Sequence, residues 1–448
     1  MRVLKYIILL WMIPAFVSCS KGTCTLKKDN PLVVILGIDG ADWQLIDPLI
    51  RKGRLPLFKK LKEECAWGYL RTTVPAKSPI IWTSIATGKS ESKHGIDDFV
   101  GPFFAKNGKR LPFLSINIRE PLLWDILTAK SLRSVLVNWY LSYPPQPLNG
   151  LNVSDYFRMR AFQPRNSQQG LLNDTVYPPA RVAEFEKFID GDYGKVLKDT
   201  GLPDFPRLFD EQGSGGHYSD HAILQKYPEF VLQENLVKKM AAHLFRTEKF
   251  NLFAVYFRMA DIVQHFAYDC FIDDAYKKKL LSSFADAVSA DRELKDAYEK
   301  VADILCPVYQ NFEKIIKEYL GNEKFKDAYF MIVSDHGFYF FLRDRTIQYN
   351  HVNGLEKAPK GILLIKGPEV KPGKISMPSI YDIAPTVLYL LNLPLDRRMD
   401  GIPLMRTFDF RRSLRYEVYE KKKSLNLRRN RALDEKNLQE LKALGYIN

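Results

Sequence analysis

Side chains that can bind metal ions follow three buried apolar runs of this 448-residue sequence. The runs are PLVVILGI, NLFAVYF and AYFMIVS, and the side chains that follow them are Asp39 after the first, Asp261 and His265 after the second, and Asp335 and His336 after the third. Runs of this kind predict buried strands, and parallel strands end at one edge of their sheet, where ligands bind. For each carboxylate taken alone, the alternative is capping of the following helix. Together the side chains predict one shared site.

The spacing of two of these residues and the position of one serine point to a chemical role. Asp261 and His265 are four residues apart, which puts both on one face of a helix, as two ligands of one ion require. His351 lies in the stretch NHVNG and adds a further imidazole. Ser78 lies in the loop PAKSP, directly before an apolar helical stretch. It is either the cap of that helix or a nucleophile that faces a positive helix end and a metal ion.

Alternating strands and helices must position these residues. A further strand is expected over 361–366, and helices over 56–64 and 121–130. Most of the Pro, Gly and aromatic irregularity lies in residues 100–250, which predicts an inserted cap over the site. The charged, amphipathic residues 270–325 predict an antiparallel helical pair. The fold class is therefore α/β, with a mostly parallel central sheet and helices on both faces.

The composition excludes several classes of protein. With 46% apolar and 26% charged residues, the chain is globular and is not disordered, collagen-like or a polytopic membrane protein. Five cysteines are too few for a disulfide-built scaffold, and the absence of a CxxC pair argues against a thiolate metal site. The sequence allows one or two disulfides, and the spacing of the cysteines does not choose among the pairings.

The residues before Cys19 resemble an export signal. Arg2 and Lys5 precede the apolar run YIILLWMIPAFVS, which is too short to span a bilayer comfortably. The tetrad FVSC resembles a bacterial lipoprotein signal, in which Cys19 carries the lipid. Because Phe16 stands where Leu is usual, plain secretory cleavage is an alternative, and an uncleaved anchor helix is another. We predict a signal peptide over 1–18, export to a bacterial periplasm or outer surface, and membrane anchoring through acyl chains.

Basic residues gather at the end of the chain. The formal net charge is +14, and residues 401–448 hold 12 Lys and Arg against 6 Asp and Glu. We predict a basic C-terminal tail over 406–448, in which LDEKNLQELKALGYI is typical of a short amphipathic helix that docks back. A solvated surface segment is the simpler interpretation, and contact with anionic lipid headgroups near the anchor is the sharper one. No nucleic-acid-binding motif accompanies the charge.

In order along the chain, these motifs resemble the alkaline phosphatase superfamily, most closely its type I phosphodiesterase and nucleotide pyrophosphatase branch. The matching stretches are GIDG, the KSP loop with WTSIATG, KHGI, ADIVQH, SDHG, His351, and the closing segments SIYDIAPTVL and DGIPL. The resemblance spans residues 31–405 and implies a three-layer α/β sandwich over that range. Residues 19–30 then form a linker.

The resemblance also implies a two-metal site and its chemistry. Its ligands to two divalent ions, usually zinc, would be Asp261, His265 and His351 for one ion, and Asp39, Asp335, His336 and Ser78 for the other. The mixture of imidazole and carboxylate suits zinc. Ser78 would attack a phosphate ester in line, and water would then hydrolyse the phospho-serine intermediate.

Two positions depart from the pattern of the branch. Ser78 stands where the branch has Thr, and Ile81 stands where it has an Asn that binds a phosphoryl oxygen. Lys77 or Arg258 would bind that oxygen instead. The C/S-x-P-x-R signature of sulfatases is absent from SPIIW, which argues against sulfate ester hydrolysis. We expect a phosphoric ester hydrolase. The alternatives are a phosphoryl or phosphoethanolamine transferase on the same site, a sulfatase-like hydrolase, and a catalytically silent binding protein.

Overall fold

The computed structural model describes residues 31–104, 108–162, 172–212, 217–284, 287–351, 358–422 and 431–447. The predicted signal peptide over 1–18, the proposed lipid site Cys19 and the linker over 19–30 lie outside the described residues. In the described ranges, no helix combines the length and the apolar character needed to cross a membrane. Within the same ranges, the three cysteines Cys65, Cys270 and Cys306 are buried and form no disulfide.

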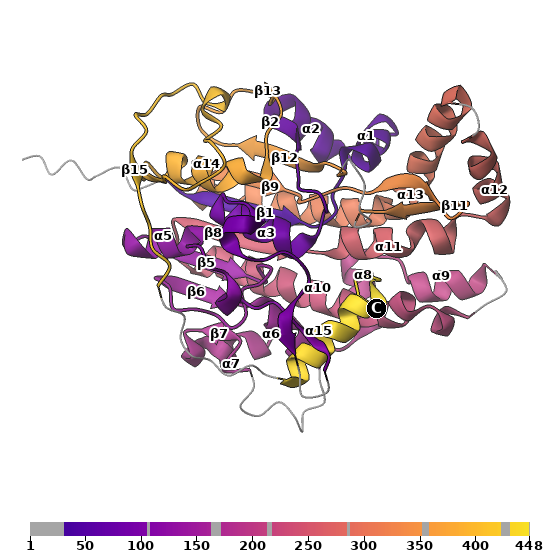
Figure 1. The fold of residues 1–448 in the computed structure, drawn as a ribbon, viewed down its shortest axis with the longest axis horizontal. Helices are drawn as coiled ribbons and strands as arrows, with labels where there is room; N and C mark the ends of the chain where they lie inside the picture. The colour runs from indigo at the N-terminus through magenta and orange to yellow at the C-terminus, as the bar shows by residue number, and fades with distance from the viewer. Residues whose placement is uncertain are drawn as a thin grey trace, which may run out of the picture. The chain divides into compact units, whose positions relative to one another are not determined.

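A nine-stranded sheet forms the centre of the described part of the chain (Figure 1). In spatial order its strands are β13 (Gly373–Lys374), β2 (Ala66–Leu70), β12 (Gly361–Lys366), β9 (Tyr329–Val333), β1 (Val33–Ile38), β8 (Leu252–Phe257), β5 (Ser134–Val137), β6 (Gly150–Val153) and β7 (Val176–Tyr177). The neighbours from β9 through β1, β8 and β5 to β6 are parallel, as are β13 and β2. β12 and β7 run antiparallel to their neighbours. The four strands expected from apolar runs are β1, β8, β9 and β12.

Helices cover both faces of this sheet. Successive side chains of a strand point to opposite faces. In β1, Val34, Leu36 and Ile38 join one apolar core, and Val33 and Ile35 join the other. The first core is packed by α1 (Trp43–Arg51), α2 (Pro56–Glu64), α10 (Ala222–Thr247), α11 (Met259–Phe271) and α13 (Ala287–Leu320). The second is packed by α3 (Ser78–Thr87), α5 (Leu123–Ala129) and α14 (Ile383–Leu390). The predicted three-layer α/β sandwich is confirmed.

The segment 100–250 differs from the expected cap. It supplies β5, β6 and β7 to the central sheet and α10 to one of its faces. Its other elements are the hairpin of β3 (Val100–Phe104) and β4 (Arg110–Pro112) and the helices α6 (Asp155–Ala161), α7 (Val182–Glu186), α8 (Tyr193–Thr200) and α9 (Phe205–Glu211). The Pro and Gly residues mark the many connections between short elements. Strands of two to four residues are too short to leave a clear apolar pattern in the sequence.

Two pairs of elements follow α11. α12 (Asp274–Ser283) contacts α13, so residues 270–325 form a helical pair as expected. The antiparallel hairpin of β10 (Tyr339–Arg343) and β11 (Thr346–Asn350) follows β9 and ends directly before His351. This hairpin brings the chain back to the sheet edge that it left after His336.

The described part of the tail is packed against the domain. Arg412 Nη1 donates to the Tyr389 carbonyl oxygen at 2.9 Å, which satisfies a carbonyl at the end of α14, and Lys421 pairs with Asp125 at 2.7 Å. The helix α15 (Arg431–Ala443) contacts α6, α10 and β4. The last helix docks back, as its amphipathic pattern predicts, whereas most side chains of residues 411–418 are exposed.

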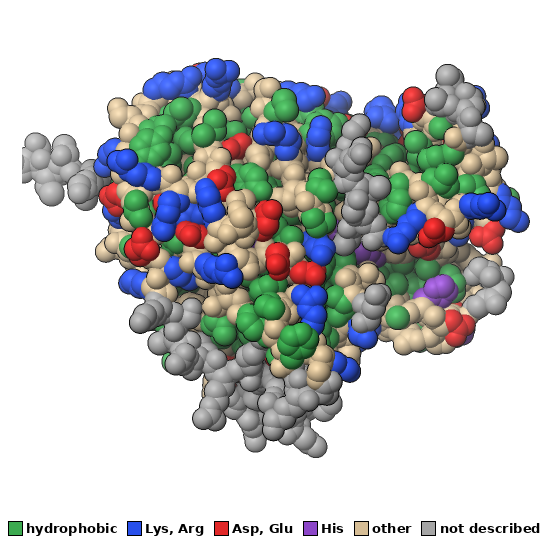
Figure 2. Space-filling view, in the orientation of Figure 1, with side chains coloured by type: hydrophobic (Ala, Val, Ile, Leu, Met, Phe, Trp, Pro, Cys, Tyr) green, Lys and Arg blue, Asp and Glu red, His purple; other side chains and the backbone are tan. Residues whose placement is uncertain are grey.

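Positive charge is dispersed on the surface. Figure 2 shows Lys and Arg side chains spread over the visible face, with Asp and Glu among them. Several of the tail's basic side chains are engaged with backbone carbonyls or carboxylates. This face therefore presents no single basic patch of the kind that binds nucleic acid.

Candidate active site

Register in the sheet brings three chain segments to one edge. Ile38 of β1 lies beside Phe257 of β8, and Gly37 lies beside Val333 of β9. The residues that follow these strands are therefore neighbours at the carboxyl edge, where α/β sheets bind ligands. Asp39 follows β1, Arg258 and α11 follow β8, and Asp335 and His336 follow β9 after one residue.

One set of metal-binding side chains consists of Asp39, Asp335 and His336. All three are buried. His336 Nε2 lies 3.3 Å from Asp39 Oδ1 and 3.3 Å from Asp335 Oδ2. Ser78 Oγ lies 3.3 Å from the same nitrogen, so the serine adjoins this set.

A second set consists of Asp261, His265 and His351. Asp261 Oδ1 lies 3.4 Å from His265 Nε2 and 3.6 Å from His351 Nε2, and the two imidazole nitrogens are 3.3 Å apart. His351 Nδ1 lies 2.8 Å from the Ala76 carbonyl oxygen. Donation to that carbonyl leaves Nε2 without a proton and free to bind a metal ion.

The two sets lie side by side. The rings of His336 and His351 are stacked, with centroids 3.7 Å apart and planes at 12°. All six predicted metal-binding residues and Ser78 are thus brought together, although they come from five segments of the chain.

The chemistry of the donors fits two cations. Asp39 Oδ1, Asp335 Oδ2 and Asp261 Oδ1 are buried and have no hydrogen-bond partner among the described residues. Burial, together with the neighbouring Asp335 and Asp261, raises the pKa of Asp39 well above its ordinary value. A buried carboxylate oxygen that lacks a hydrogen-bond partner and is repelled by its neighbours needs either a proton or a nearby positive charge. A divalent ion in each set would supply that charge.

Ser78 is the first residue of α3. The capping position before the helix belongs to Lys77, whose side chain makes no cap hydrogen bond. Ser78 therefore does not cap α3, and one of its two predicted roles is excluded. Its hydroxyl is buried at the positive end of the helix and faces the metal-binding set.

Two glycines allow the site to close tightly. A Cβ atom at Gly37 would lie 2.8 Å from the ring of Trp82, so the glycine lets α3 pack against β1 and bring Ser78 close to Asp39. Gly40 has φ = +71°, and a Cβ atom there would lie 2.9 Å from Asp261 Cα. The first and last positions of GIDG thus have a steric reason to be glycine.

The predicted substrate-binding residues have different surroundings. Lys77 pairs with Asp98 at 2.8 Å and is not among the residues that line the described cavity beside Ser78. Arg258 does line that cavity, but its Nη1 binds Glu440 Oε2 at 2.9 Å. Ile81 is buried in the second core, so no polar group replaces the Asn of the branch at that position.

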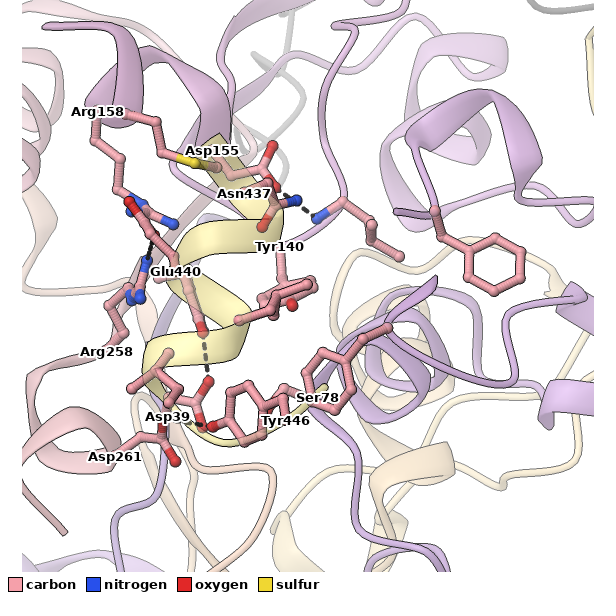
Figure 3. Close-up of a pocket in the computed structure, with 17 residues that line it drawn as sticks. Asp39, Ser78, Tyr140, Asp155, Arg158, Arg258, Asp261, Asn437, Glu440 and Tyr446 are labelled. Carbon is pink, nitrogen blue, oxygen red and sulfur yellow. Dashed lines mark hydrogen bonds and ion pairs between the residues drawn. The ribbon is translucent and has the colours of Figure 1, made fainter. Parts of the chain in front are cut away.

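The C-terminal segment forms the opposite wall of the cavity (Figure 3). The Tyr446 hydroxyl donates to Asp261 Oδ2 at 2.8 Å and lies 2.8 Å from His265 Nε2 and 3.3 Å from His351 Nε2. Sequence reasoning missed Tyr446 and Glu440. The amphipathic pattern of the last helix shows that it docks, but not where.

His94 of the KHGI stretch has a structural role. Its Nε2 lies 3.0 Å from Ser84 Oγ, and its Nδ1 accepts from the Ile96 amide at 3.2 Å. Burial lowers the pKa of His94 to about 3, which keeps the ring neutral. It supports the end of α3 through contacts with neighbours and belongs to neither metal-binding set.

Comparison with known proteins agrees with this geometry. The model of the family described as type I phosphodiesterase / nucleotide pyrophosphatase matches residues 33–386. The chain belongs to this family. The family assignment indicates a hydrolase. No curated protein matches the sequence.

Solved structures share the fold at low sequence identity. A 2-O GAG sulfatase matches with a TM-score of 0.51 and 10% identity, covering 88% of this chain and 78% of the sulfatase. A phosphonate monoester hydrolase from Silicibacter pomeroyi matches with a TM-score of 0.46 and 12% identity, covering 85% and 78%. The sulfatase match supports the alkaline-phosphatase-like α/β sandwich.

Proposed function

We propose that this protein is a two-metal phosphoric ester hydrolase that uses Ser78 as its nucleophile. The observation that carries the proposal is the placement of a buried serine at a helix N-terminus, 3.3 Å from an imidazole of one donor set, beside a second donor set. Each set offers three ligands, and a catalytic ion keeps a further position for the reacting groups.

Zinc is the ion that these residues suit best. Each set combines imidazole with carboxylate, the mixture that a borderline-soft divalent ion takes. Asp261, His265 and His351 would hold one ion, and Asp39, Asp335 and His336 would hold the other, with Ser78 adjoining it. Bound there, the ions supply Lewis acidity, which lowers the pKa of a nearby hydroxyl and offsets charge on phosphoryl oxygens.

The residues of the chain then perform a two-step displacement. Ser78 Oγ, freed of its proton, forms a bond to phosphorus as the ester bond breaks and the alcohol leaves with a proton. Water next attacks the phospho-Ser78 intermediate, breaks the Oγ–P bond and restores the hydroxyl. The positive end of α3 faces the developing charge in both steps. Tyr256 donates its hydroxyl to Asp39 and holds that ligand in place.

A phosphate ester is preferred over a sulfate ester as the substrate. Sulfatases use a formylglycine formed within the C/S-x-P-x-R signature, and here Pro79 directly follows Ser78. An unmodified serine is a nucleophile that suits phosphoryl transfer.

Ser78→Ala in the full, zinc-loaded chain tests the proposal. We expect turnover of p-nitrophenyl phosphate or bis-p-nitrophenyl phosphate to be lost while zinc content is kept, and Ser78→Thr to retain part of it. The exposed Ser92→Ala is the matched control. Full activity of Ser78→Ala would exclude the mechanism, and turnover of p-nitrophenyl sulfate alone would exclude the substrate class. Product analysis with and without glycerol separates a hydrolase from a transferase.

The proposed enzyme is exported and lipid-anchored at Cys19. The support is the run of Arg2, Lys5 and an apolar stretch before FVSC. Cys19→Ser in a bacterial host should move the protein from the membrane fraction to the soluble exported fraction. Retention in the membrane would contradict lipid attachment.

A further inference from the structure

Two arginines from different elements converge on one carboxylate beside the proposed metal centre. Arg158 of α6 and Arg258, which follows β8, both bind Glu440 Oε2, at 3.2 Å and 2.9 Å from their Nη1 atoms. Gln233 Nε2 donates to the other oxygen, Glu440 Oε1, at 3.1 Å. Glu440 belongs to α15, whereas the three residues that bind it belong to the catalytic domain.

This cluster is buried, and within it Glu440 is the carboxylate that pairs directly with both guanidinium groups. Arg158 is 6% exposed, Arg258 is 7% exposed and Glu440 is 2% exposed. Burial alone would raise the pKa of Glu440, but the two arginines hold it well below its ordinary value, so the carboxylate is ionised. Glu234 accepts from the backbone amide of Arg258 and does not contact its guanidinium in any described hydrogen bond. Without Glu440, two guanidinium groups would face the cavity.

The arginine pair has unused hydrogen-bonding capacity. Arg158 Nε is buried and has no hydrogen-bond partner within the described part of the chain. Glu440 Oε2 accepts one hydrogen bond from the Nη1 atom of each arginine, so neither guanidinium binds the carboxylate in a bidentate manner. A larger anion with more oxygens, such as phosphate, could use these donors more fully.

The arginines and the proposed nucleophile share one cavity. Ser78, Asp39, Arg158 and Arg258 all line it, and Glu440 extends from α15 toward the two arginines (Figure 3). With α15 docked, the cavity has a volume of ≈ 30 Å³. That space holds about one water molecule. A phosphate ester therefore requires α15 to move.

The same segment also reaches the second donor set. The Tyr446 hydroxyl lies 2.8–3.3 Å from the side chains of Asp261, His265 and His351. The three atoms of these side chains that could bind a metal ion lie 3.3–3.6 Å from one another. The hydroxyl oxygen lies beside them as a further atom that could bind the ion. The C-terminal segment thus places a carboxylate at the arginines and an oxygen at the metal-binding residues at the same time.

Side-chain contacts hold α15 against the domain. Asn437 Nδ2 donates to the Tyr156 hydroxyl at 2.8 Å, and Lys436 Nζ donates to the Met159 carbonyl at 2.6 Å. α15 pairs with no strand of the described sheets. Its departure would leave every hydrogen bond of the central sheet in place.

We propose that Arg158 and Arg258 form an anion-binding subsite for a second negatively charged group of the substrate, and that Glu440 occupies this subsite until the substrate displaces α15. This inference rests on the proposed function. It narrows the substrate class to phosphate esters that carry a further phosphate or carboxylate group. The C-terminal segment acts as an intramolecular competitor for the site.

Binding of orthophosphate and pyrophosphate to the zinc-loaded full chain tests the proposal. Ser78→Ala serves as the background, so that pyrophosphate is not consumed, and calorimetry gives both affinities. We expect Arg158→Gln and Arg258→Gln to weaken pyrophosphate binding at least about tenfold, with a much smaller change for orthophosphate. Glu440→Gln should tighten pyrophosphate binding several-fold, because it removes the competing charge.

Matched control variants and a milder substitution test whether a loss of pyrophosphate affinity is caused by unfolding. Arg246→Gln and Glu435→Gln alter exposed residues of the same types and should change neither affinity. Arg158→Lys keeps the charge and should lower pyrophosphate affinity less than Arg158→Gln does. An equal loss of both ligands in the arginine variants, or no loss of either, would show that the cluster is only a structural ion pair and would overturn the proposal.

Amide hydrogen exchange provides the second measurement. Pyrophosphate should increase exchange in residues 434–444, whereas in its absence these amides should be protected. Continued protection of α15 with pyrophosphate bound would mean that the helix is not displaced.

The outcomes of these experiments also distinguish failure of the two-metal function from failure of the anion-binding subsite. If the two-metal function is wrong, orthophosphate binding or zinc binding fails in every variant. If only the subsite is wrong, both persist and the arginine variants bind pyrophosphate as their background does.

Discussion

The two walls of the cavity beside Ser78 are built in different ways. The first wall is the sheet edge: Asp39 lines the cavity there, and Asp335 and His336 lie directly behind it. These residues follow the central strands β1 and β9 directly or after one residue. Each of these two strands is paired on both sides: β1 is parallel to β8 and β9, and β9 is parallel to β1 and antiparallel to β12. The other wall is α15 and Tyr446, which are held by side-chain contacts to α6, α10 and β4.

This difference separates what must be rigid from what can move. Metal ligands need fixed positions, and the ends of central strands provide them because the sheet restrains the backbone. A docked helix with no strand pairing can leave at a much smaller cost in free energy than a strand. We therefore expect changes in the first wall to abolish chemistry, and changes in the second wall to alter access and affinity.

The largest effect is expected from a ligand in the first wall. Asp335→Asn removes a charge from the donor set while keeping the shape of the side chain. Turnover should fall by at least about 10²-fold, because the ion is lost or weakly held. Metal content measured by mass spectrometry should fall along with the rate. The exposed Asp97→Asn is the control, and an active, fully loaded Asp335→Asn protein would contradict the assignment.

Gly40→Ala tests the rigidity of the same wall. Gly40 has φ = +71°, and the added Cβ would meet the backbone of α11 at Asp261 Cα. We expect a loss of about 1–3 kcal/mol in the free energy of unfolding, measured by denaturant titration. Gly53→Ala is the matched control, because Gly53 has φ = +69° but nothing within 4 Å of its Cβ. Equal losses in both variants would assign the whole effect to backbone strain and none to the close approach of α11.

Tyr446→Phe tests the second wall with a smaller expected effect. The variant removes the hydroxyl that contacts Asp261, His265 and His351. It keeps the ring that stacks on Phe99. Orthophosphate should bind the zinc-loaded protein up to about tenfold more tightly, because the oxygen no longer competes for the site. Calorimetry measures the change, with the exposed Tyr416→Phe as the control. Weaker binding in Tyr446→Phe would show instead that the hydroxyl contributes to ligand binding.

The smallest effect at neutral pH concerns the titration of Glu440. Its pKa in the docked state lies below its ordinary value of 4.5, chiefly because Arg158 and Arg258 outweigh the effect of burial. The ionised carboxylate therefore stabilises docking above that ordinary value, and this stabilisation is lost as pH falls below it. Exchange protection of residues 434–444, corrected for intrinsic rates, should be constant above about pH 5 and drop as pH falls below 4.5. In Glu440→Gln this drop should be absent; the same drop in that variant would assign it to other groups.

Much of the first wall could be predicted from the sequence because its signals are local. Each ligand lies next to a buried apolar run or at a helical spacing, so short stretches such as GIDG and SDHG contain both the strand end and the donor. The order of these stretches also predicted the family. The position of Ser78 relative to the helix was decided by the structure, which gives the cap position to Lys77.

Other predictions failed because they depend on contacts between distant segments. The apolar runs of β5, β6 and β7 are short, and their place in the central sheet depends on neighbours that the sequence does not name. Lys77 was a candidate for binding the phosphoryl oxygen, but Asp98 lies within reach of it after the chain folds. Glu440 is at least 182 residues from the arginines that it binds, and Tyr446 is at least 95 residues from the candidate metal ligands that it contacts, so no spacing rule connects them.

The sequence by itself determined the candidate site residues of this protein: a serine and six side chains suited to metal ions, which lie after a strand, at the start of a helix or, for His265, one helical turn further on. Only the tertiary structure decided what closes the site. An amphipathic helix can bury its apolar face against any complementary surface, so its pattern predicts that it docks and says nothing of the partner. Here the helix docks against α6, α10 and β4, and its Glu440 binds Arg158 and Arg258. The docked helix forms the second wall of the candidate active site.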